Sequence, residues 1–432
     1  MAKPIGPPSG MRDFLPSEKA RREDLLAEIR SEYQRHGFDE IETPVLEESS
    51  RLHSGLGGDN EKLAFGVLRR GLTRSDWQRS ESALDLVDLG LRYDLTVPLA
   101  RFYAAHRAEL PTVFKSIQIA PVWRAERPQK GRFRQFVQCD IDIIGDSSQL
   151  AEVELLVATA SALRKIGLTK CTIRINDRRI LDSYLDLWNV PYELRAAALV
   201  SIDKFDKIGR EGVLDDLFQL GAITTQSVGG VSALLSVPPQ LGSEWALDGL
   251  EGLPPIAREI FNSLRRLAQG VRALTGLRVE FDPTLVRGMG YYTGTIFEIK
   301  HADLSYSLGG GGRYDDMIGR YLGERVPAVG MSLGFERIVD LAKPKLRRRT
   351  AAAVVFHDPE HDPFELANLK RHLLRKFRRV RLERKPRNLR KALDRLNAER
   401  FTTYTTVHPG VSPTEPLFWR DMIEDAWSPD RL

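Results

Sequence analysis

Apolar residues near the start of the chain follow first a helical and then a strand spacing. Over residues 17–37 they recur every three or four positions, from Leu25 to Tyr33, which predicts an amphipathic helix. Over residues 38–46 they alternate with polar residues, which predicts a strand. Pro44 interrupts this strand and cannot donate to a ladder, so we expect the strand at a sheet edge or an interface.

The middle of the chain shows a long helical stretch between strand-like segments. Residues 171–181 alternate like a strand, and strand patterns return at 277–281 and 293–299. Between them, residues 182–276 show helical spacing, with neither a cluster of nucleophiles nor a phosphate-binding loop. This pattern predicts a mainly helical insertion. Further along, four consecutive glycines at 309–312 predict a turn.

Beyond a basic linker at residues 343–349, strand and helix patterns alternate regularly. The predicted strand, helix, strand, helix and strand lie at 351–357, 363–377, 380–383, 388–399 and 401–407. This βαβαβ order predicts a separate, small α/β domain.

Composition indicates a folded protein without disulfides or a membrane anchor. The 432 residues are 42% hydrophobic, which is enough for a large core. Cys139 and Cys171 are the two cysteines; their spacing fits no metal motif and suits a reducing compartment. The N-terminal residues lack the apolar segment of a signal peptide, and no apolar run reaches the length of a membrane span. We therefore expect a cytoplasmic protein.

Positive charge is concentrated in one region of the chain. Residues 343–400 hold 19 Lys or Arg and seven Asp or Glu, whereas residues 1–342 hold 43 and 47. Such a region suits a polyanion, most plausibly nucleic acid. A solvated helix surface would give the same count, so charge alone leaves both interpretations open.

Residues 121–142 combine two strand patterns with an unusual set of charges. Arg124 and Glu126 stand at alternate positions of the first strand, and a loop over 127–134 carries four cations. The returning strand places three polar side chains on one face, Gln138, Asp140 and Asp142. Arginine offers a rigid fork of donors to phosphate, and carboxylates can take an ammonium group. Because charges within strands are costly without partners, this hairpin is a candidate binding site as well as a possible solvated turn.

A second candidate site lies at residues 285–298, where three glycines accompany Arg287, Tyr291 and Tyr292. Glycine lets the backbone approach a ligand closely, and these side chains offer charge and polar ring edges. The glycine spacing matches neither a dinucleotide fingerprint nor a phosphate loop.

These segments, in this order, resemble the motifs of class II aminoacyl-tRNA synthetases in the form found in histidyl-tRNA synthetases. Residues 121–142 resemble motif 2, residues 285–298 and 307–315 resemble the two histidine signatures, and residues 327–337 resemble motif 3. The helix, strand and proline near the N-terminus resemble motif 1, which builds the homodimer interface in that family.

The resemblance implies an α+β fold: an antiparallel sheet with flanking helices, a mainly helical insertion and a small C-terminal α/β domain. It places the catalytic core at 1–181 and 277–346 and the insertion at 182–276. The C-terminal domain at 347–432 is similar to the family's anticodon-binding domain but shorter.

The resemblance also implies a reaction and its partners. Histidine and ATP would give histidyl-adenylate and pyrophosphate, and the histidyl group would pass to the 3′ end of the histidine tRNA. Mg²⁺ is expected with ATP, without a metal held by protein side chains. His357 and His361 have the spacing of metal ligands but lack a third, and we expect them in a surface loop.

The family's site residues carry over by position. Arg287 and Arg124 would be catalytic, and Gln129 and Arg134 would meet the acceptor end of the tRNA. The expected ATP-binding residues are Arg124, Glu126, Arg132 and Arg337. The expected histidine-binding residues are Asp94, Thr96, Gln138, Asp142, Arg287, Tyr291, Tyr292 and Tyr314. Of these, Asp94, Thr96, Gln138 and Asp142 would hold the amino group, and Tyr292 and Tyr314 would line the imidazole pocket.

A different class of function remains open. Synthetase-like chains also serve as non-catalytic regulators that sense histidine or bind tRNA, and these typically lose the catalytic arginines. Arg124, Arg287 and Arg337 are all present here, which favours the enzyme. The departures from the family pattern are Gly290 in place of the usual Asp, and Asp94 and Asp142 in place of the Glu of many bacterial members.

Overall fold

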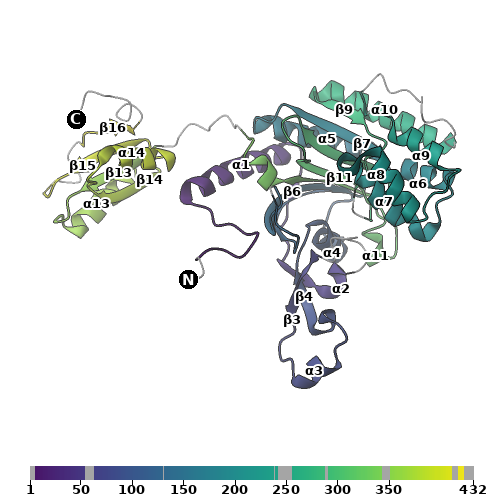
Figure 1. The fold of residues 1–432 in the computed structure, drawn as a ribbon. Helices are drawn as coiled ribbons and strands as arrows, with labels where there is room; N and C mark the ends of the chain where they lie inside the picture. Colours follow the sequence, from purple (N-terminus) through teal and green to yellow (C-terminus); the bar gives the residue numbers. More distant parts are fainter. Residues whose placement is uncertain are drawn as a thin grey trace. The chain divides into compact units, whose positions relative to one another are not determined.

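The structure is a computed structural model that describes residues 5–53, 63–129, 131–237, 239–241, 255–287, 290–342, 351–410 and 417–422. Tertiary contacts divide the chain into two units, residues 1–12 with 25–343, and residues 13–24 with 344–432 (Figure 1). Among the described residues, no helix combines the length and apolar character that crossing a membrane requires.

The larger unit is built on a nine-stranded sheet of order β1-β5-β6-β12-β11-β10-β7-β9-β8. Neighbouring strands are antiparallel except for the pairs β1–β5 and β7–β9. The strands are Asp39–Glu40 (β1), Phe114–Trp123 (β5), Gln135–Ile144 (β6), Cys171–Asp177 (β7), Gln240–Leu241 (β8), Arg278–Phe281 (β9), Thr295–His301 (β10), Gly309–Arg313 (β11) and Ala328–Gly334 (β12). The predicted α+β class is confirmed, and the antiparallel prediction holds for the centre of the sheet.

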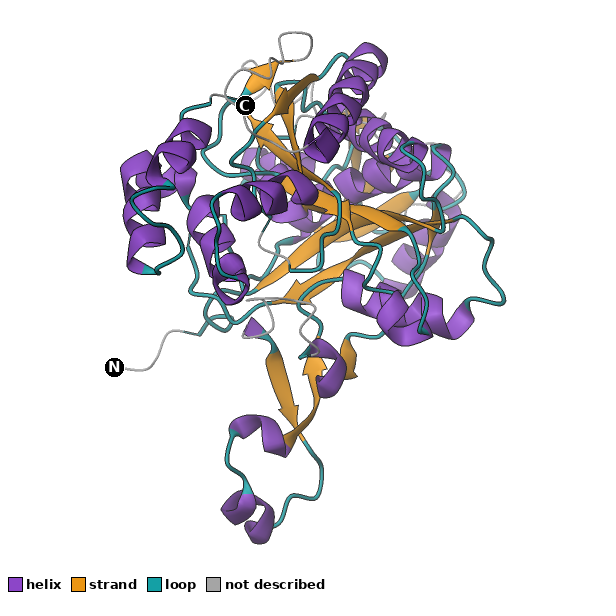
Figure 2. Ribbon diagram, turned by 90° about the vertical axis from the view of Figure 1, so that its right-hand side faces the viewer, coloured by secondary structure: helices purple, strands orange, loops and turns teal. Residues whose placement is uncertain are grey.

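Helices pack against this sheet and bury a continuous apolar core (Figures 1 and 2). The helices over residues 16–338 are Pro16–Arg35 (α1), Ser49–Leu52 (α2), Arg74–Arg79 (α3), Thr96–His106 (α4), Leu150–Lys165 (α5), Arg178–Leu187 (α6), Arg195–Asp203 (α7), Phe205–Gln219 (α8), Val228–Leu235 (α9), Pro255–Thr275 (α10), Gly319–Leu322 (α11) and Phe335–Ile338 (α12), with 3₁₀ turns at Ala83–Leu86 (η2) and Tyr192–Leu194 (η3). The stretch predicted as a mainly helical insertion consists, in its described residues, of helices joined by turns and loops, with the short strand β8.

The strand predicted over residues 38–46 is two strands. After β1 the chain leaves the main sheet, and Leu46–Glu48 (β2) joins Val87–Leu91 (β4) and Phe65–Leu68 (β3) in a small sheet of order β2-β4-β3. Pro44 lies between the two strands, where its missing donor is tolerated. Strand β1 is an edge of the main sheet, as predicted. The small sheet and α3 form an arm that extends from the larger unit (Figures 1 and 2).

The four glycines predicted as a turn are instead the central strand β11. A Cβ on Gly309 would lie 2.3 Å from the Ser332 carbonyl oxygen, and one on Gly311 would lie 1.9 Å from the Gly330 carbonyl oxygen. Because these four residues have no side chains, neighbouring groups can approach the backbone of this part of the strand closely.

The C-terminal part of the smaller unit has the predicted βαβαβ order. Its strands are Ala352–His357 (β13), Arg379–Arg384 (β14), Thr403–Val407 (β15) and Arg420–Asp421 (β16), in the order β14-β13-β15-β16, and its helices are Pro363–Leu373 (α13) and Leu389–Ala398 (α14). Phe356 packs with α14 and Val355 with α13, so the two helices cover opposite faces of the sheet. The antiparallel edge strand β16 was not predicted.

Candidate active site

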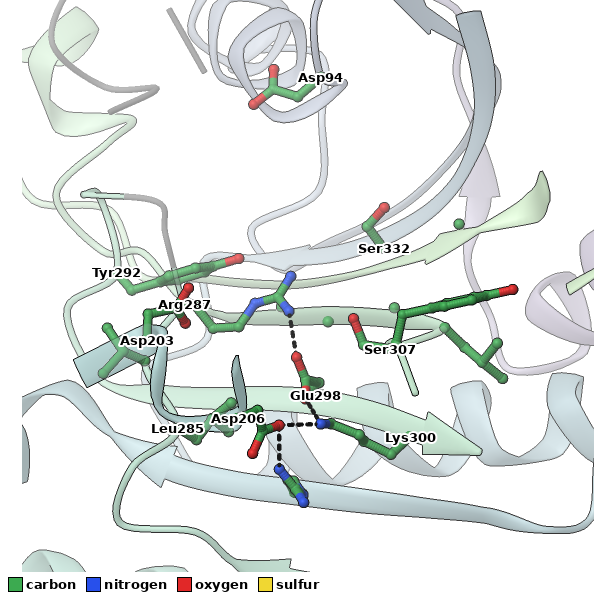
Figure 3. Close-up of a pocket in the computed structure, with 18 of the residues that line it drawn as sticks. Asp94, Asp203, Asp206, Leu285, Arg287, Tyr292, Glu298, Lys300, Ser307 and Ser332 are labelled. Carbon is green, nitrogen blue, oxygen red and sulfur yellow. Dashed lines mark hydrogen bonds and ion pairs between the residues drawn. The ribbon is translucent and has the colours of Figure 1, made fainter. Parts of the chain in front are cut away.

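A cavity of about 1630 Å³ opens beside the central strands of the larger unit (Figure 3). Every residue that the sequence predicts to bind histidine or ATP lines this cavity, together with Gln129. Residues from five separate stretches of chain thus meet in one place. Arg134 does not line the cavity. Its Nε donates to the Glu126 carbonyl oxygen at 3.0 Å, and its backbone N–H donates to the Gly10 carbonyl oxygen at 2.8 Å, so it fixes the hairpin connection.

The hairpin differs in one respect from the sequence prediction. Strand β5 ends at Trp123, so Arg124 and Glu126 lie in the connection and not on an alternating strand. The backbone N–H of Arg124 still donates to the Arg134 carbonyl oxygen at 2.9 Å, which keeps the start of the connection in strand-like pairing. Lys130, one of the four loop cations, lies outside the described residues.

Four arginines that line the cavity have few anionic partners: Arg124, Arg132, Arg287 and Arg337. Glu126 lies 3.1 Å from Arg132 and 4.0 Å from Arg124, and the Nη1 of Arg337 donates to the Ser307 carbonyl oxygen at 2.8 Å. Burial lowers the pKa of Arg337, and the positive charges of Arg132, Arg287 and Arg124 lower it further. This mutual repulsion would be relieved by a polyanion, so the cluster has the electrostatics of a phosphate site.

Arg287 follows β9 and reaches into the centre of the cavity (Figure 3). Its Nη1 donates to Glu298 at 3.3 Å, and its buried Nε has no hydrogen-bond partner among the described residues. Burial works against the charged form, but Tyr292, Glu298 and Asp203 outweigh it and raise the pKa of Arg287. The guanidinium is therefore a permanent cation with donors available to a ligand.

Two buried oxygens without donors lie in the same cavity. One oxygen of Asp94 accepts from the Val97 N–H of helix α4 at 3.2 Å, whereas its Oδ2 has no partner among the described groups. The amide nitrogen of Gln138 donates to Ser332 at 2.7 Å and to Asp140 at 3.2 Å, which leaves the Gln138 Oε1 unpartnered there. Buried acceptors without donors are costly and suit an ammonium ligand.

A tyrosine–carboxyl pair forms another part of the cavity. The hydroxyl of Tyr314 donates to Asp142 Oδ1 at 2.6 Å, and the rings of Tyr291 and Tyr314 lie 5.8 Å apart at a steep angle. Burial raises the pKa of Asp142 to about 7 although the Tyr314 bond opposes it, and burial raises that of Asp94 to about 6. These carboxyls can therefore change charge when a cationic ligand arrives.

Three further residues of the site were not assigned from the sequence. Asp140 is buried between Gln138 and Asp142, and its pKa is raised well above the usual range by burial and by the charge of Asp142. The sequence placed Asp140 on the polar face of the strand beside Gln138 and Asp142, which could have identified it as a site residue, but the resemblance gave it no role. Ser332 gave no signal, because its partner Gln138 lies in a distant segment. Glu298 ends the candidate segment 285–298, but the resemblance gave it no role although its partner Arg287 lies in the same segment.

This chain is similar to proteins named as histidyl-tRNA synthetases or histidine–tRNA ligases. A protein-family model described as histidyl-tRNA synthetase matches residues 10–338. A histidine–tRNA ligase of Leifsonia xyli is 54% identical over 416 residues, covering 94% of this chain and 96% of the relative. A probable histidine–tRNA ligase of Tropheryma whipplei is 42% identical over 427 residues, covering 96% of this chain and 98% of the relative.

Solved structures give the same result. A crystal structure of histidyl-tRNA synthetase from Nostoc is 26% identical, with a TM-score of 0.74, and the match covers 98% of this chain and 96% of that one. The resemblance inferred from the motifs is confirmed, and the chain belongs to the histidyl-tRNA synthetase family.

Proposed function

We propose that the protein activates histidine with ATP and transfers it to the histidine tRNA. The observation that carries this proposal is the meeting of Arg124, Arg287 and Arg337 with unpartnered buried acceptors in one cavity. Such a site can hold a triphosphate and an amino acid side by side. The names of the relatives, histidine–tRNA ligase, support the same activity.

Adenylate formation requires stabilisation of charge on the α-phosphate. As the histidine carboxylate attacks, negative charge grows on the non-bridging phosphate oxygens, and preorganised cations lower this barrier. Arg124 and Arg287 supply the charge at the α-phosphate, and Arg337 with Arg132 holds the distal phosphates. Glu126 lies beside the adenine. The reaction needs no covalent enzyme nucleophile.

The two ends of histidine have distinct partners. The ammonium group of histidine would be bound by the two unpartnered oxygens, Asp94 Oδ2 and Gln138 Oε1. Thr96, the first residue of helix α4, would lie beside them. Because Tyr314 is bonded to Asp142, we place Asp142 at the imidazole end with Tyr314, Tyr291 and Tyr292, which revises its expected place beside the amino group. A carboxyl and hydroxyl pair there would reject side chains without ring nitrogens.

ATP is expected to enter with Mg²⁺. Among the described residues, no group of three or more His, Cys, Asp and Glu is arranged to hold a metal ion. The side chains that the proposal places at the phosphates are arginines, which suit the phosphates and not the ion, so we propose that Mg²⁺ is carried by the triphosphate oxygens. When bound, it would neutralise the charge of pyrophosphate.

The tRNA would contact two parts of the chain. Gln129 lies on the exposed hairpin connection and lines the cavity, so it can reach an acceptor end there, with Arg134 behind it. The basic C-terminal domain would bind more distant phosphates. We propose that the helical insertion spans residues 182–276 and that the C-terminal domain begins at residue 347. We also propose that this translation enzyme acts in the cytoplasm.

We also propose a homodimer. Large apolar side chains are exposed on the arm and its surroundings, including Leu46 and Leu68 of the small sheet, Trp77 of α3 and Leu84. Covering such side chains with a second copy would remove apolar surface from water. Sedimentation of the full chain at micromolar concentration tests this proposal, and a monomer would contradict it.

Histidine-dependent exchange of pyrophosphate into ATP tests the function. We expect exchange with histidine and none with other amino acids, and loss of most activity in Arg287→Ala. Losing one such donor costs about 3–4 kcal/mol of barrier height. A non-catalytic regulator would bind histidine in calorimetry without any exchange, and that result would overturn the enzymatic proposal.

A further inference from the structure

Glu298 and Lys300 stand two positions apart on β10, on the face of the sheet that carries the Arg287 guanidinium (Figure 3). Glu298 Oε2 lies 3.3 Å from Arg287 Nη1, and Glu298 Oε1 lies 3.7 Å from Lys300 Nζ. The two oxygens of one carboxylate are therefore divided between two cations.

The next charge comes from the helical stretch. Asp206, the second residue of α8, forms an ion pair with Lys300. Asp206 also lies 3.3 Å from Arg174 of β7, which in turn lies 3.0 Å from the buried Asp282. Although burial opposes it, the hydrogen bond and charge of Lys300, with the charge of Arg174, lower the pKa of Asp206, which keeps it anionic.

This arrangement controls how strongly Glu298 can hold Arg287. Without Lys300, the whole charge of Glu298 would act on Arg287, and both carboxylate oxygens could bind its fork. The guanidinium would then turn away from the cavity and lose part of its attraction for phosphate. Lys300, which lies 3.7 Å from one of these oxygens, would oppose this change by sharing the charge of Glu298, and Asp206 would hold Lys300 beside it.

We propose that Lys300 and Asp206 are positioning residues that hold the Arg287 guanidinium in its productive orientation. The helical stretch would thereby take part in adenylate formation, although it contributes no group to the reacting atoms. The inference rests on the proposed role of Arg287 in that step. It assigns a function to α8, for which the sequence gave no chemistry.

The chain offers a matched control for this proposal. Asp216, on the part of α8 that follows a break at Gly209, forms a partly exposed ion pair with Lys204 at 2.8 Å. Asp206→Asn and Asp216→Asn each remove one carboxylate charge from α8 and one lysine partner. They differ in that the lysine paired with Asp206 lies beside Glu298, and in that Asp206 also pairs with Arg174.

The test is histidine-dependent pyrophosphate exchange by the full chain, with kcat and KM measured separately. We expect Asp206→Asn and Lys300→Met to lower kcat about tenfold, with KM for histidine nearly unchanged. Lys300→Arg, which keeps the charge, should retain most of the activity, and Asp216→Asn should match the wild type. Combining Asp206→Asn with Lys300→Met should add little to either single effect, because both act through one pair.

Two results separate the possible failures. If Arg287→Ala is inactive but Asp206→Asn behaves like Asp216→Asn, the positioning proposal is wrong and the proposed function stands. If Arg287→Ala keeps its exchange activity, the catalytic assignment itself is wrong. Equal kcat losses in both α8 variants, with equal losses of thermal stability, would indicate a purely structural role and also overturn the proposal.

Discussion

The guanidinium of Arg287 lies directly against the backbone of Gly310. A Cβ built on Gly310 would come within 2.4 Å of Arg287 Cζ and 2.6 Å of Arg287 Nη1. Gly310 is paired with Glu298 across the β10–β11 ladder, so the arginine crosses a strand without side chains to reach its carboxylate. The glycine run is thus part of the catalytic geometry as well as of the sheet.

Gly310→Ala should therefore impair chemistry more than folding. The added methyl group meets the far end of a flexible side chain, which can move aside, but moving Arg287 by about 1 Å can cost on the order of 100-fold in rate. We expect a large fall in kcat for pyrophosphate exchange and a melting temperature close to that of the wild type.

Gly311→Ala is the matched comparison on the same strand. Its Cβ would lie 1.9 Å from the Gly330 carbonyl oxygen, where backbone would have to shift. This variant should lose stability, by a few kcal/mol as for other overpacked core sites. Full exchange activity in Gly310→Ala would show that the close contact has no catalytic role.

Much of this site follows from the sequence, because motif residues keep their order and strand alternation fixes which side chains share a face. Gln138, Asp140 and Asp142 could be placed together for that reason. The link between Asp142 and Tyr314 could not, since 172 positions separate them. The strand at Gly309–Arg313 was missed because glycine by itself favours turns, and only the groups packed against it stabilise an extended strand.

The buried carboxyls should make the ligand-free protein less stable as the pH rises. A carboxyl with a raised folded-state pKa stabilises the fold below its unfolded pKa and loses that contribution as the pH rises through the folded value. For Asp142 this window runs from the usual aspartate pKa of 3.8 to a pKa of about 7. Unfolding by urea at pH 5, 6, 7 and 8 should show the decline.

Asp142→Asn should remove part of that decline, on the order of 1–4 kcal/mol between pH 5 and 8. The exposed Asp88, changed to Asn, serves as the control and should leave the slope unaltered. An Asp142→Asn protein with the wild-type slope would mean that Asp142 does not hold a proton at neutral pH in the free enzyme.

Tyr314→Phe should weaken histidine recognition without affecting ATP. The change removes the 2.6 Å bond that holds the Asp142 carboxyl at the imidazole end, and leaving a buried polar group without its hydrogen bond costs about 1–3 kcal/mol. We expect KM for histidine to rise roughly 10- to 100-fold in the exchange assay. The KM for ATP is the internal control, and an equal rise in both constants would argue against an imidazole contact.

The basic face of α14 provides the last prediction. Arg387, Arg390 and Lys391 are exposed at or just before the start of this helix, whose N-terminal dipole adds to the attraction for phosphate. Replacing all three with alanine should weaken tRNA binding and reduce the salt dependence, because each lost phosphate contact lowers the slope of log K against log salt by about 0.7–0.9. Pyrophosphate exchange should be unchanged.

A second triple variant distinguishes a specific surface from general charge. Arg371, Arg375 and Lys376 are exposed on or just after α13, which covers the opposite face of the same sheet, and their replacement removes the same charge. If α14 binds the tRNA, this control should keep most of the affinity and the salt slope in filter-binding titrations. Equal losses from the two triple variants would show that the domain attracts tRNA through its net charge, and an unchanged α14 variant would remove this helix from the tRNA interface altogether.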